Sequence, residues 1–173
     1  MKHLPGSIIV MTLLLIFVTL DGKAQNEPSK DVTKAKDVRH NLTFQHTTLV
    51  VSDFSVSKEF YLGLLQLEEM EADWLPENQM FVSLGNNLEL HVGEVEGVEI
   101  NPSSFNHFAM STEDLDGFLL YLKENGIVYS GLGGGDKYEV FERPDGVRQT
   151  FFQDPDGYWL EVNDATDEKR ILR

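Results

Sequence analysis

The chain repeats a short pattern twice, and this repeat limits the possible fold more than any other feature of the sequence. His46 lies in a run of β-prone residues, and Asp53 follows it by seven positions at the start of a helical pattern. His107 and Asp114 recur with the same spacing. Because Asp53 or Ser55, and later Asp114, can cap a helix, each half predicts a strand followed directly by a helix.

The first half continues with three strand candidates after its helix. We expect the first strand at 42–51, a helix whose Val56, Phe60 and Leu64 recur every fourth position, and further strands at 67–72, 79–84 and 87–92. In the last of these, Glu89 and His91 share one face, opposite the aliphatic residues between them. The segment 93–102 is acidic and rich in turn residues, so we interpret it as a crossover between halves.

The second half predicts the same order of elements. Its helix carries leucines and a phenylalanine at core spacing and ends at Asn125-Gly126, a common C-terminal signal. The glycine-rich segment 131–136 lacks the lysine of a phosphate loop, and we interpret it as a mobile flap. A strand at 147–152 and the turn 154–157 then lead to a last strand, in which Tyr158, Leu160 and Val162 form one face and Trp159, Glu161 and Asn163 the other. We take Leu88-Glu89-Leu90 as the counterpart of Leu160-Glu161-Val162.

The N-terminus has the pattern of a secretory signal peptide, residues 1–24. An apolar run of 13 residues, from Ile8 to Leu20, is shorter than the roughly 20 residues that span a bilayer, so we expect cleavage near Ala24/Gln25 and no stable membrane anchor. The predicted location is therefore secreted or periplasmic. Residues 25–40 are predicted to be a flexible spacer, 41–164 a single domain with modules at about 41–93 and 105–164, and 165–173 a polar tail.

Charge and composition exclude several classes of function. A formal net charge of −15 repels phosphates and argues against a nucleic-acid partner, which leaves a small-molecule substrate as the expected partner. The chain has no cysteine, so disulfides, thiolate ligands and a catalytic thiol are excluded.

Two histidines and two glutamates follow the internal repeat and form the candidate site. His46 and His107 lie on equivalent strands, and Glu89 and Glu161 lie on the closing strands of the two halves. Two imidazoles and two carboxylates suit one divalent ion of Zn, Ni, Co, Mn or Fe. Each residue alone also fits a structural or solvated role, and the shared repeat is what favours the metal.

Two further residues are candidates for substrate binding. His91 lies on the same face as Glu89 and could replace it as ligand, could line the pocket, or could be a plain surface histidine. Arg148 could hold an anionic group of a substrate or could pair with a surface acid.

At this level the chain resembles the vicinal oxygen chelate superfamily, the group of glyoxalase I, bleomycin resistance proteins and extradiol dioxygenases. The resemblance covers about residues 42–162. It rests on five segments: His46-Thr-Thr-Leu-Val-Val-Ser-Asp53, Phe60-Tyr61 with Gly63-Leu64, Leu88-Glu89-Leu90, Asn106-His107-Phe-Ala-Met, and Asp154-Pro-Asp-Gly-Tyr-Trp-Leu-Glu161. It implies an α+β fold of paired βαβββ modules, with curved mixed sheets around a central pocket and one metal, often completed in a homodimer.

Within that group the ligand types are most similar to those of glyoxalase I. The resemblance implies His46, Glu89, His107 and Glu161 as metal ligands and Glu161 as the residue that moves a proton. Bacterial glyoxalase I has an arginine and an asparagine for glutathione where this chain has Val50 and Gly93. We therefore expect an exported, metal-dependent lyase or isomerase that acts on a small carbonyl or hydroxyacyl substrate without glutathione.

Two other classes remain open. A metal-free binding protein of the bleomycin-resistance kind would sequester an antibiotic with the same fold. An extradiol dioxygenase or a thiol transferase would use only two histidines and one glutamate.

Overall fold

The computed structural model describes residues 42–165, and its elements belong to the unit Thr43–Arg173. The predicted signal peptide, the spacer and the tail beyond Ala165 lie outside the described residues. Within the part of the chain that is described, no helix combines the length and the apolar character that a membrane span needs.

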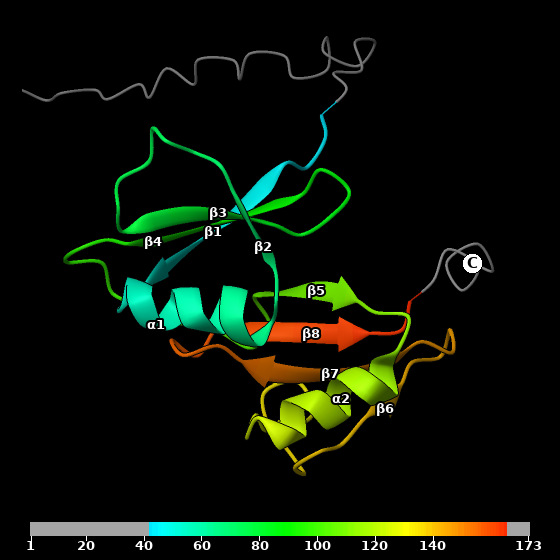
Figure 1. The fold of residues 1–173 in the computed structure, drawn as a ribbon. Coiled ribbons are helices and arrows are strands. Elements are labelled where there is room, and N and C mark those ends of the chain that lie inside the picture. Colours follow the sequence, from blue (N-terminus) through cyan, green and yellow to red (C-terminus); the bar gives the residue numbers. More distant parts are fainter. Residues whose placement is uncertain (1–41, 166–173) are drawn as a thin grey trace, which may run out of the picture. The chain divides into compact units, whose positions relative to one another are not determined.

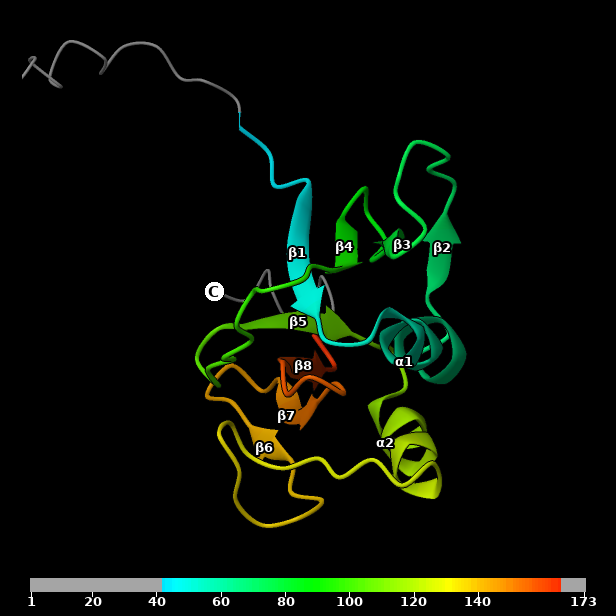
Figure 2. The same ribbon diagram turned by 90° about the vertical axis from the view of Figure 1, so that its left-hand side faces the viewer.

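Two four-stranded sheets form the fold, one from each half of the chain (Figures 1 and 2). The first contains β1 (His46–Val51), α1 (Phe54–Lys58) with a π-helical segment (Glu59–Leu64), β2 (Glu68–Met70), β3 (Gln79–Ser83) and β4 (Glu89–Glu94). The second contains β5 (His107–Ser111), α2 (Leu115–Glu124), β6 (Phe141–Glu142), β7 (Arg148–Gln153) and β8 (Trp159–Asn163).

The two sheets have the same topology. The strand order is β1-β4-β3-β2 in the first and β5-β8-β7-β6 in the second. In each, the strand before the helix is parallel to the last strand, and the other neighbours are antiparallel. This is the predicted paired βαβββ fold. The sheets are not closed, since β1 and β5 are each an edge strand and no strand pairing among the described residues joins one sheet to the other.

The predicted helix boundaries are confirmed by their caps. The Asp53 carboxylate accepts hydrogen bonds from the backbone N–H groups of Ser55 and Val56, and the Asp114 carboxylate accepts one from Gly117. The second helix ends at Glu124 with Asn125 as its C-cap, and Gly126 follows with a φ of +78°, a left-handed conformation that glycine adopts without strain.

The predicted contact face of the first helix is wrong at Val56, which is 48% exposed. The buried residues of this stretch are Ser57, Phe60 and Tyr61, which recur at three- and four-residue intervals, so the buried face lies beside Val56 and not on it. Phe60 and Tyr61 are consequently buried next to each other, whereas strict fourth-residue spacing predicts only Phe60. The predicted start of the first strand at residue 42 is also wrong, because β1 begins at His46 and Leu42 is 91% exposed.

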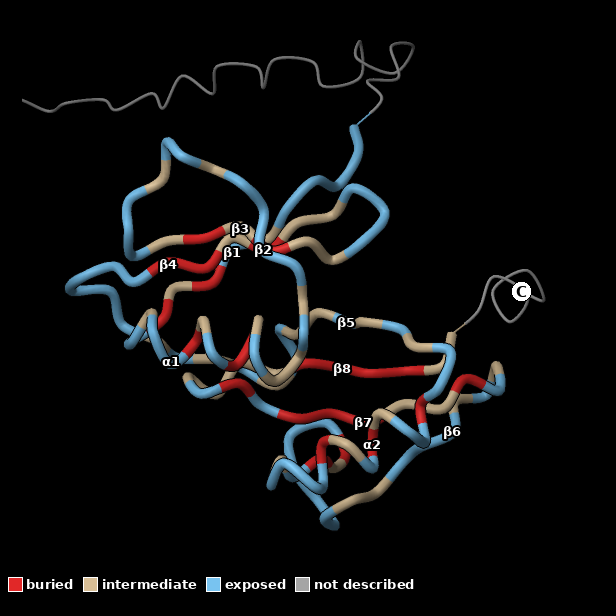
Figure 3. Tube along the Cα trace, viewed as in Figure 1, coloured by how far each residue is buried: buried red, intermediate tan, exposed pale blue. Residues whose placement is uncertain are grey.

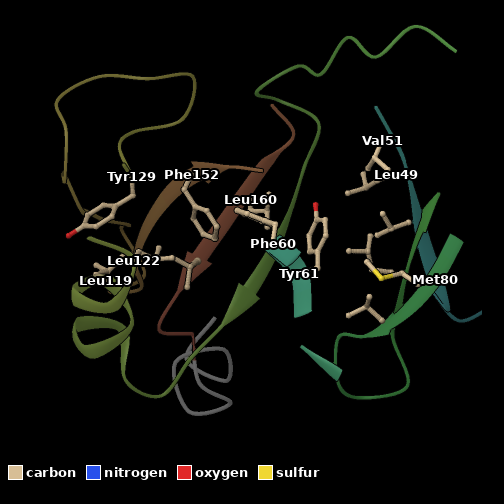
Figure 4. Close-up of a cluster of buried hydrophobic side chains, with 14 of the residues drawn as sticks. Leu49, Val51, Phe60, Tyr61, Met80, Leu119, Leu122, Tyr129, Phe152 and Leu160 are labelled. Carbon is tan, nitrogen blue, oxygen red and sulfur yellow. The ribbon is translucent and has the colours of Figure 1, made fainter. Parts of the chain in front are cut away.

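Side chains from both sheets meet around the first helix. Figure 4 shows Phe60 and Tyr61 between Leu49, Val51 and Met80 on one side and Phe152 and Leu160 on the other. Leu160 and Val162 are buried, which confirms the predicted core face of the last strand.

The turn before β8 is also as predicted. Gly157 has a φ of +85°, and β7 and β8 are antiparallel neighbours. The other face of β8 is less open than its sequence indicates, because Glu161 and Asn163 are buried as well; Figure 3 shows β8 buried along most of its length.

Candidate functional site

His107 and Glu161 form the best-defined part of the candidate site. Their strands β5 and β8 are parallel neighbours, and His107 Nε2 lies 3.3 Å from Glu161 Oε2. The side chain of His107 is 22% exposed and that of Glu161 is 9% exposed, so the pair is mostly shielded but can be reached from solvent. An imidazole nitrogen and a carboxylate oxygen thus converge at one edge of the second sheet.

The other nitrogen of His107 has its own partner, which orients the ring. Nδ1 lies 3.1 Å from the backbone carbonyl oxygen of Ser104, so Nδ1–H donates to that oxygen in the neutral tautomer. Nε2 then carries the lone pair. A metal-binding histidine commonly has this arrangement, in which a backbone carbonyl fixes the tautomer and the plane of the ring.

Glu161 is held in place by two neighbours. Asn163 Nδ2 donates a 2.7 Å hydrogen bond to Glu161 Oε1, and Arg143 Nη1 lies 3.9 Å from the same oxygen. The two oxygens of the carboxylate are therefore differentiated: Oε1 accepts from the amide and faces the guanidinium, while Oε2 faces His107. This leaves Oε2 as the atom that can take a cation or a proton.

The first sheet carries a related group on its corresponding face. The ring of His46 lies edge-on to Phe81, with centroids 5.8 Å apart, and Phe81 stacks on His91 at 4.5 Å. His46 Nδ1 hydrogen-bonds to the side-chain oxygen of Gln45, and His91 Nε2 lies 2.9 Å from Gln79 Oε1. Partial burial, and secondly the nearby His46, lower the pKa of His91, which favours a neutral imidazole.

Strand register changes which residues of the two halves correspond. His46 is opposite Glu89, whereas His107 is opposite Trp159; Thr48 is opposite His91, as Ala109 is opposite Glu161. The counterpart of Glu161 is therefore His91, and our predicted pairing of Leu88-Glu89-Leu90 with Leu160-Glu161-Val162 is shifted by two residues.

The aromatic neighbours support the same correspondence. Phe81 lies opposite His91, and Phe151 lies opposite Glu161. His107 is edge-on to Phe151 at 5.2 Å, just as His46 is to Phe81. Glu89 nevertheless shares the face of His46 and His91 and is partly buried, so either Glu89 or His91 could act as ligand.

The structure does not bring the two halves of the site together within one chain. Among residues 42–165, no group of three or more histidine, aspartate or glutamate side chains is arranged to hold a metal ion. His107 and Glu161 form one half-site, and His46 with Glu89 or His91 forms another. The four-residue metal site remains a prediction.

Arg148 is occupied by acidic partners. Its guanidinium donates to Asp116 at 2.9 Å and to Asp164 at 2.9 Å, and these bonds raise its pKa. Asp116 belongs to α2, so Arg148 lies toward the helix and not on the face of Glu161. The guanidinium near Glu161 is that of Arg143.

Sequence reasoning missed Arg143, although a signal was present. Residues 144–146 repeat the Pro-Asp-Gly of residues 155–157, and both glycines have a positive φ. The first of these turns predicts a second hairpin, which the structure contains between β6 and β7. Arg143 begins that turn, and its backbone N–H donates to the carbonyl oxygen of Val147.

A buried hydrogen bond supports the turn before β8. Tyr61 donates to Asp154 Oδ2 at 2.7 Å, while the backbone N–H groups of Asp156 and Tyr158 donate to the other oxygen. Tyr158 in turn donates to the carbonyl oxygen of Val50 in β1. The first half of the chain thus fixes the position of the strand that carries Glu161.

Comparison with known proteins agrees with this architecture. The family model described as Glyoxalase/Bleomycin resistance protein/Dioxygenase superfamily matches residues 43–162. No curated protein matches the chain.

Solved structures with the same fold carry names that imply different activities. Oxidase ChaP-H2 is 24% identical, with a TM-score of 0.60 over 73% of this chain and 96% of that one. Lactoylglutathione lyase from Agrobacterium tumefaciens is 17% identical, with a TM-score of 0.55 over 73% and 96%. The fosfomycin resistance protein FosX from Listeria monocytogenes is 23% identical, with a TM-score of 0.56 over 78% and 99%. At these identities the likeness shows the fold alone.

Proposed function

The chain belongs to the Glyoxalase/Bleomycin resistance protein/Dioxygenase superfamily, and on that premise we propose that it is a metal-dependent lyase or isomerase that moves a proton on a small carbonyl or hydroxyacyl substrate. The observation that carries the proposal is the convergence of His107 Nε2 and Glu161 Oε2 at 3.3 Å. Both atoms are the donor atoms that their side chains offer to a divalent ion.

The residues present fit a divalent metal in the chemistry of their donors. The carbonyl oxygen of Ser104 fixes His107 in the ligating tautomer, and Asn163 orients the carboxylate of Glu161. His46 resembles His107, since its Nδ1 also has an oxygen partner. The proposed ligands are therefore His107, Glu161 and His46, with His91 or Glu89 as the fourth.

A second copy of the chain would complete this set. One chain supplies two half-sites that do not meet among the described residues. Most homo-oligomers are symmetric, so a twofold dimer that places His46 of one copy beside His107 of the other would create two equivalent sites. We include this homodimer in the proposal.

In such a site, a bound divalent ion would polarise the carbonyl and hydroxyl oxygens of the substrate and so acidify the neighbouring C–H bond. Glu161 would take that proton at Oε2 when this oxygen is not bound to the ion, and would return it to the adjacent carbon. Asn163 holds Oε1 during this transfer, which keeps the carboxylate aimed at the substrate. Burial of Glu161 beside Phe151 limits the access of water to the carboxylate.

The proposed reaction does not use glutathione. Val50 and Gly93 are opposite each other on β1 and β4, and a side chain at Gly93 would come within 3.0 Å of Gln79. Neither residue offers a charged group to the tripeptide. Export after cleavage near Ala24/Gln25 also belongs to the proposal, and mass spectrometry of the mature protein tests it through the expected N-terminal residue Gln25.

Proton exchange tests the reaction without knowledge of the product. The metal-loaded protein is incubated with dihydroxyacetone in heavy water, and NMR follows the loss of its C–H signals. We expect exchange in the original protein and none above background in the Glu161→Gln variant. Purified protein that holds no transition metal and exchanges at the background rate would refute the proposal.

The register favours one second candidate, an iron-dependent oxygenase. In the strand register, His91 occupies the position that corresponds to Glu161, so the proposed site contains several histidines and the carboxylate of Glu161. Two histidines and one carboxylate hold Fe(II) in many oxygenases. Uptake of oxygen with catechol, dependent on ferrous iron, would select this alternative over proton transfer.

A further inference from the structure

We infer that Arg143 binds a carboxylate group of the substrate and so directs the proposed site toward 2-oxo and 2-hydroxy acids. This inference rests on the proposed function, because it names the substrate class of the same site. It is carried by the position of the guanidinium beside Glu161.

The guanidinium of Arg143 lies close to the proposed site. Its Nη1 lies 3.9 Å from Glu161 Oε1, and that carboxylate also faces His107. The guanidinium therefore lies one side chain away from the atoms that we propose to bind the metal and move the proton. Its 31% exposure leaves it open to a small molecule that enters from solvent.

The guanidinium of Arg143 keeps part of its capacity to donate hydrogen bonds. Asp145 takes one nitrogen, Nη2, at 2.7 Å. The distance of 3.9 Å from Nη1 to Glu161 exceeds a hydrogen bond, so this nitrogen still has donor capacity. A guanidinium forms a planar fork of N–H groups, and this fork matches the two oxygens of a planar carboxylate.

Two other cationic side chains, those of Arg148 and Lys58, pair with acids elsewhere. Arg148 is held by two aspartates on the helix side of β7, and Lys58 pairs with Glu69 on the surface. The open face of the first sheet carries Glu89 and His91 on β4 and Gln79 and Phe81 on β3, which offer no positive charge to a carboxylate. Of these cations, all in the part of the chain that the structure describes, Arg143 is the one that lies beside Glu161.

Charge explains why a local cation is required. The chain has a formal net charge of −15, which repels anions. Salt screens this repulsion beyond a distance of about 8–10 Å. Asp145 holds Arg143 in place but also neutralises part of its charge. A substrate carboxylate that reaches Arg143 gains charge-assisted hydrogen bonds that the uncharged analogue cannot form.

Hydroxypyruvate and dihydroxyacetone form a matched pair of probes. Both place a hydroxyl next to a carbonyl, and only hydroxypyruvate adds a carboxylate. Binding is measured by titration of the Co(II)-loaded protein through its visible spectrum, and proton transfer by NMR exchange in heavy water.

The expected result is a preference for hydroxypyruvate in the original protein, by about tenfold or more in affinity. Arg143→Gln should remove this preference, because it weakens the binding of hydroxypyruvate more than that of dihydroxyacetone, while Arg143→Lys should restore part of it, because lysine keeps the charge without the fork. Lys58→Gln, which removes the same charge from the surface, should behave as the original protein.

Two results would overturn the inference, and they are distinguishable. In the first, cobalt binds, and hydroxypyruvate and dihydroxyacetone have the same affinity in the original protein and in Arg143→Gln. Arg143 then does not bind the carboxylate, and the proposed function still stands. If cobalt does not bind, the proposed function fails and the inference fails with it.

Discussion

Tyr61 donates a 2.7 Å hydrogen bond to Asp154, and this buried contact joins the first module to the turn that precedes Glu161. Tyr61 has no exposed surface, and Asp154 is 6% exposed. Burial, and secondly the neighbouring carboxylate of Asp154, raise the pKa of Tyr61, so the hydroxyl remains a donor at every physiological pH.

Tyr61→Phe should destabilise the protein by about 1–3 kcal/mol, because it leaves a buried carboxyl oxygen without its donor. Denaturation in urea, followed by circular dichroism, measures the change. Tyr138→Phe is the matched control, since Tyr138 contacts Tyr129 and Lys123 through its ring, and we expect a change below about 0.5 kcal/mol. Equal effects of the two substitutions would contradict the role of this hydrogen bond.

Asp154 predicts a specific pH dependence of stability. Burial raises its pKa above the ordinary 3.8, although hydrogen bonds from Tyr61 and the backbone oppose the shift. Between the ordinary pKa and the raised one, the folded state binds more protons than the unfolded state, so this residue's contribution to stability falls as pH rises through that window.

Asp154→Asn tests this sign. Asparagine can keep the backbone hydrogen bonds at its oxygen and donate to Tyr61, so it imitates the protonated acid at every pH. The free energy of unfolding of the original protein, minus that of the variant, should decrease as pH rises above 3.8. A difference that stays constant or increases over this range would show that the carboxyl is not shifted upward.

Local signals in the sequence were sufficient for most elements of the fold, although the short strand β6 was not predicted. The aspartates at positions 53 and 114 were recognisable as caps because a carboxylate satisfies the free N–H groups of a helix start, whatever the tertiary context. The turn at Gly157 was predictable for the same reason. The exposure of Val56 was not predictable, because the buried face runs through Ser57, Phe60 and Tyr61, and the polar Ser57 gives no apolar signal for it.

The sequence pattern does not determine the pairing register of the strands. A strand alternates with a period of two, so a shift by two residues leaves every side chain on the same face. Glu89 and His91 therefore fit the repeat equally well until the pairing of β1 with β4 is known. The partners of Arg143 and Arg148 depend in the same way on the pairing of β6, β7 and β8, so the sequence left open whether Arg148 holds an anionic group or pairs with a surface acid.

The corrected register predicts that His91 contributes more to metal binding than Glu89. His91→Gln should reduce the affinity for Co(II) by more than about tenfold, the least that loss of even an outer contact of a metal site causes. Glu89→Gln should have a smaller effect, because its counterpart in the second half is Trp159. Competition against a coloured chelator measures both affinities, and a larger loss in Glu89→Gln would favour the original assignment.

The separation of the two half-sites predicts that inactive variants can restore each other. One variant carries His46→Ala and His91→Ala, and the other carries His107→Ala and Glu161→Ala, so each should bind almost no metal alone. In a mixed dimer, both damaged half-sites can meet at one site, which leaves the other site intact. Mixing the subunits equally, after reversible dissociation, should therefore recover about a quarter of the original metal content, since about half of the dimers are mixed and each has one of its two sites. Elemental analysis after gel filtration measures the recovery. A mixture that binds no more metal than its components would show that the four residues do not form a site across two copies.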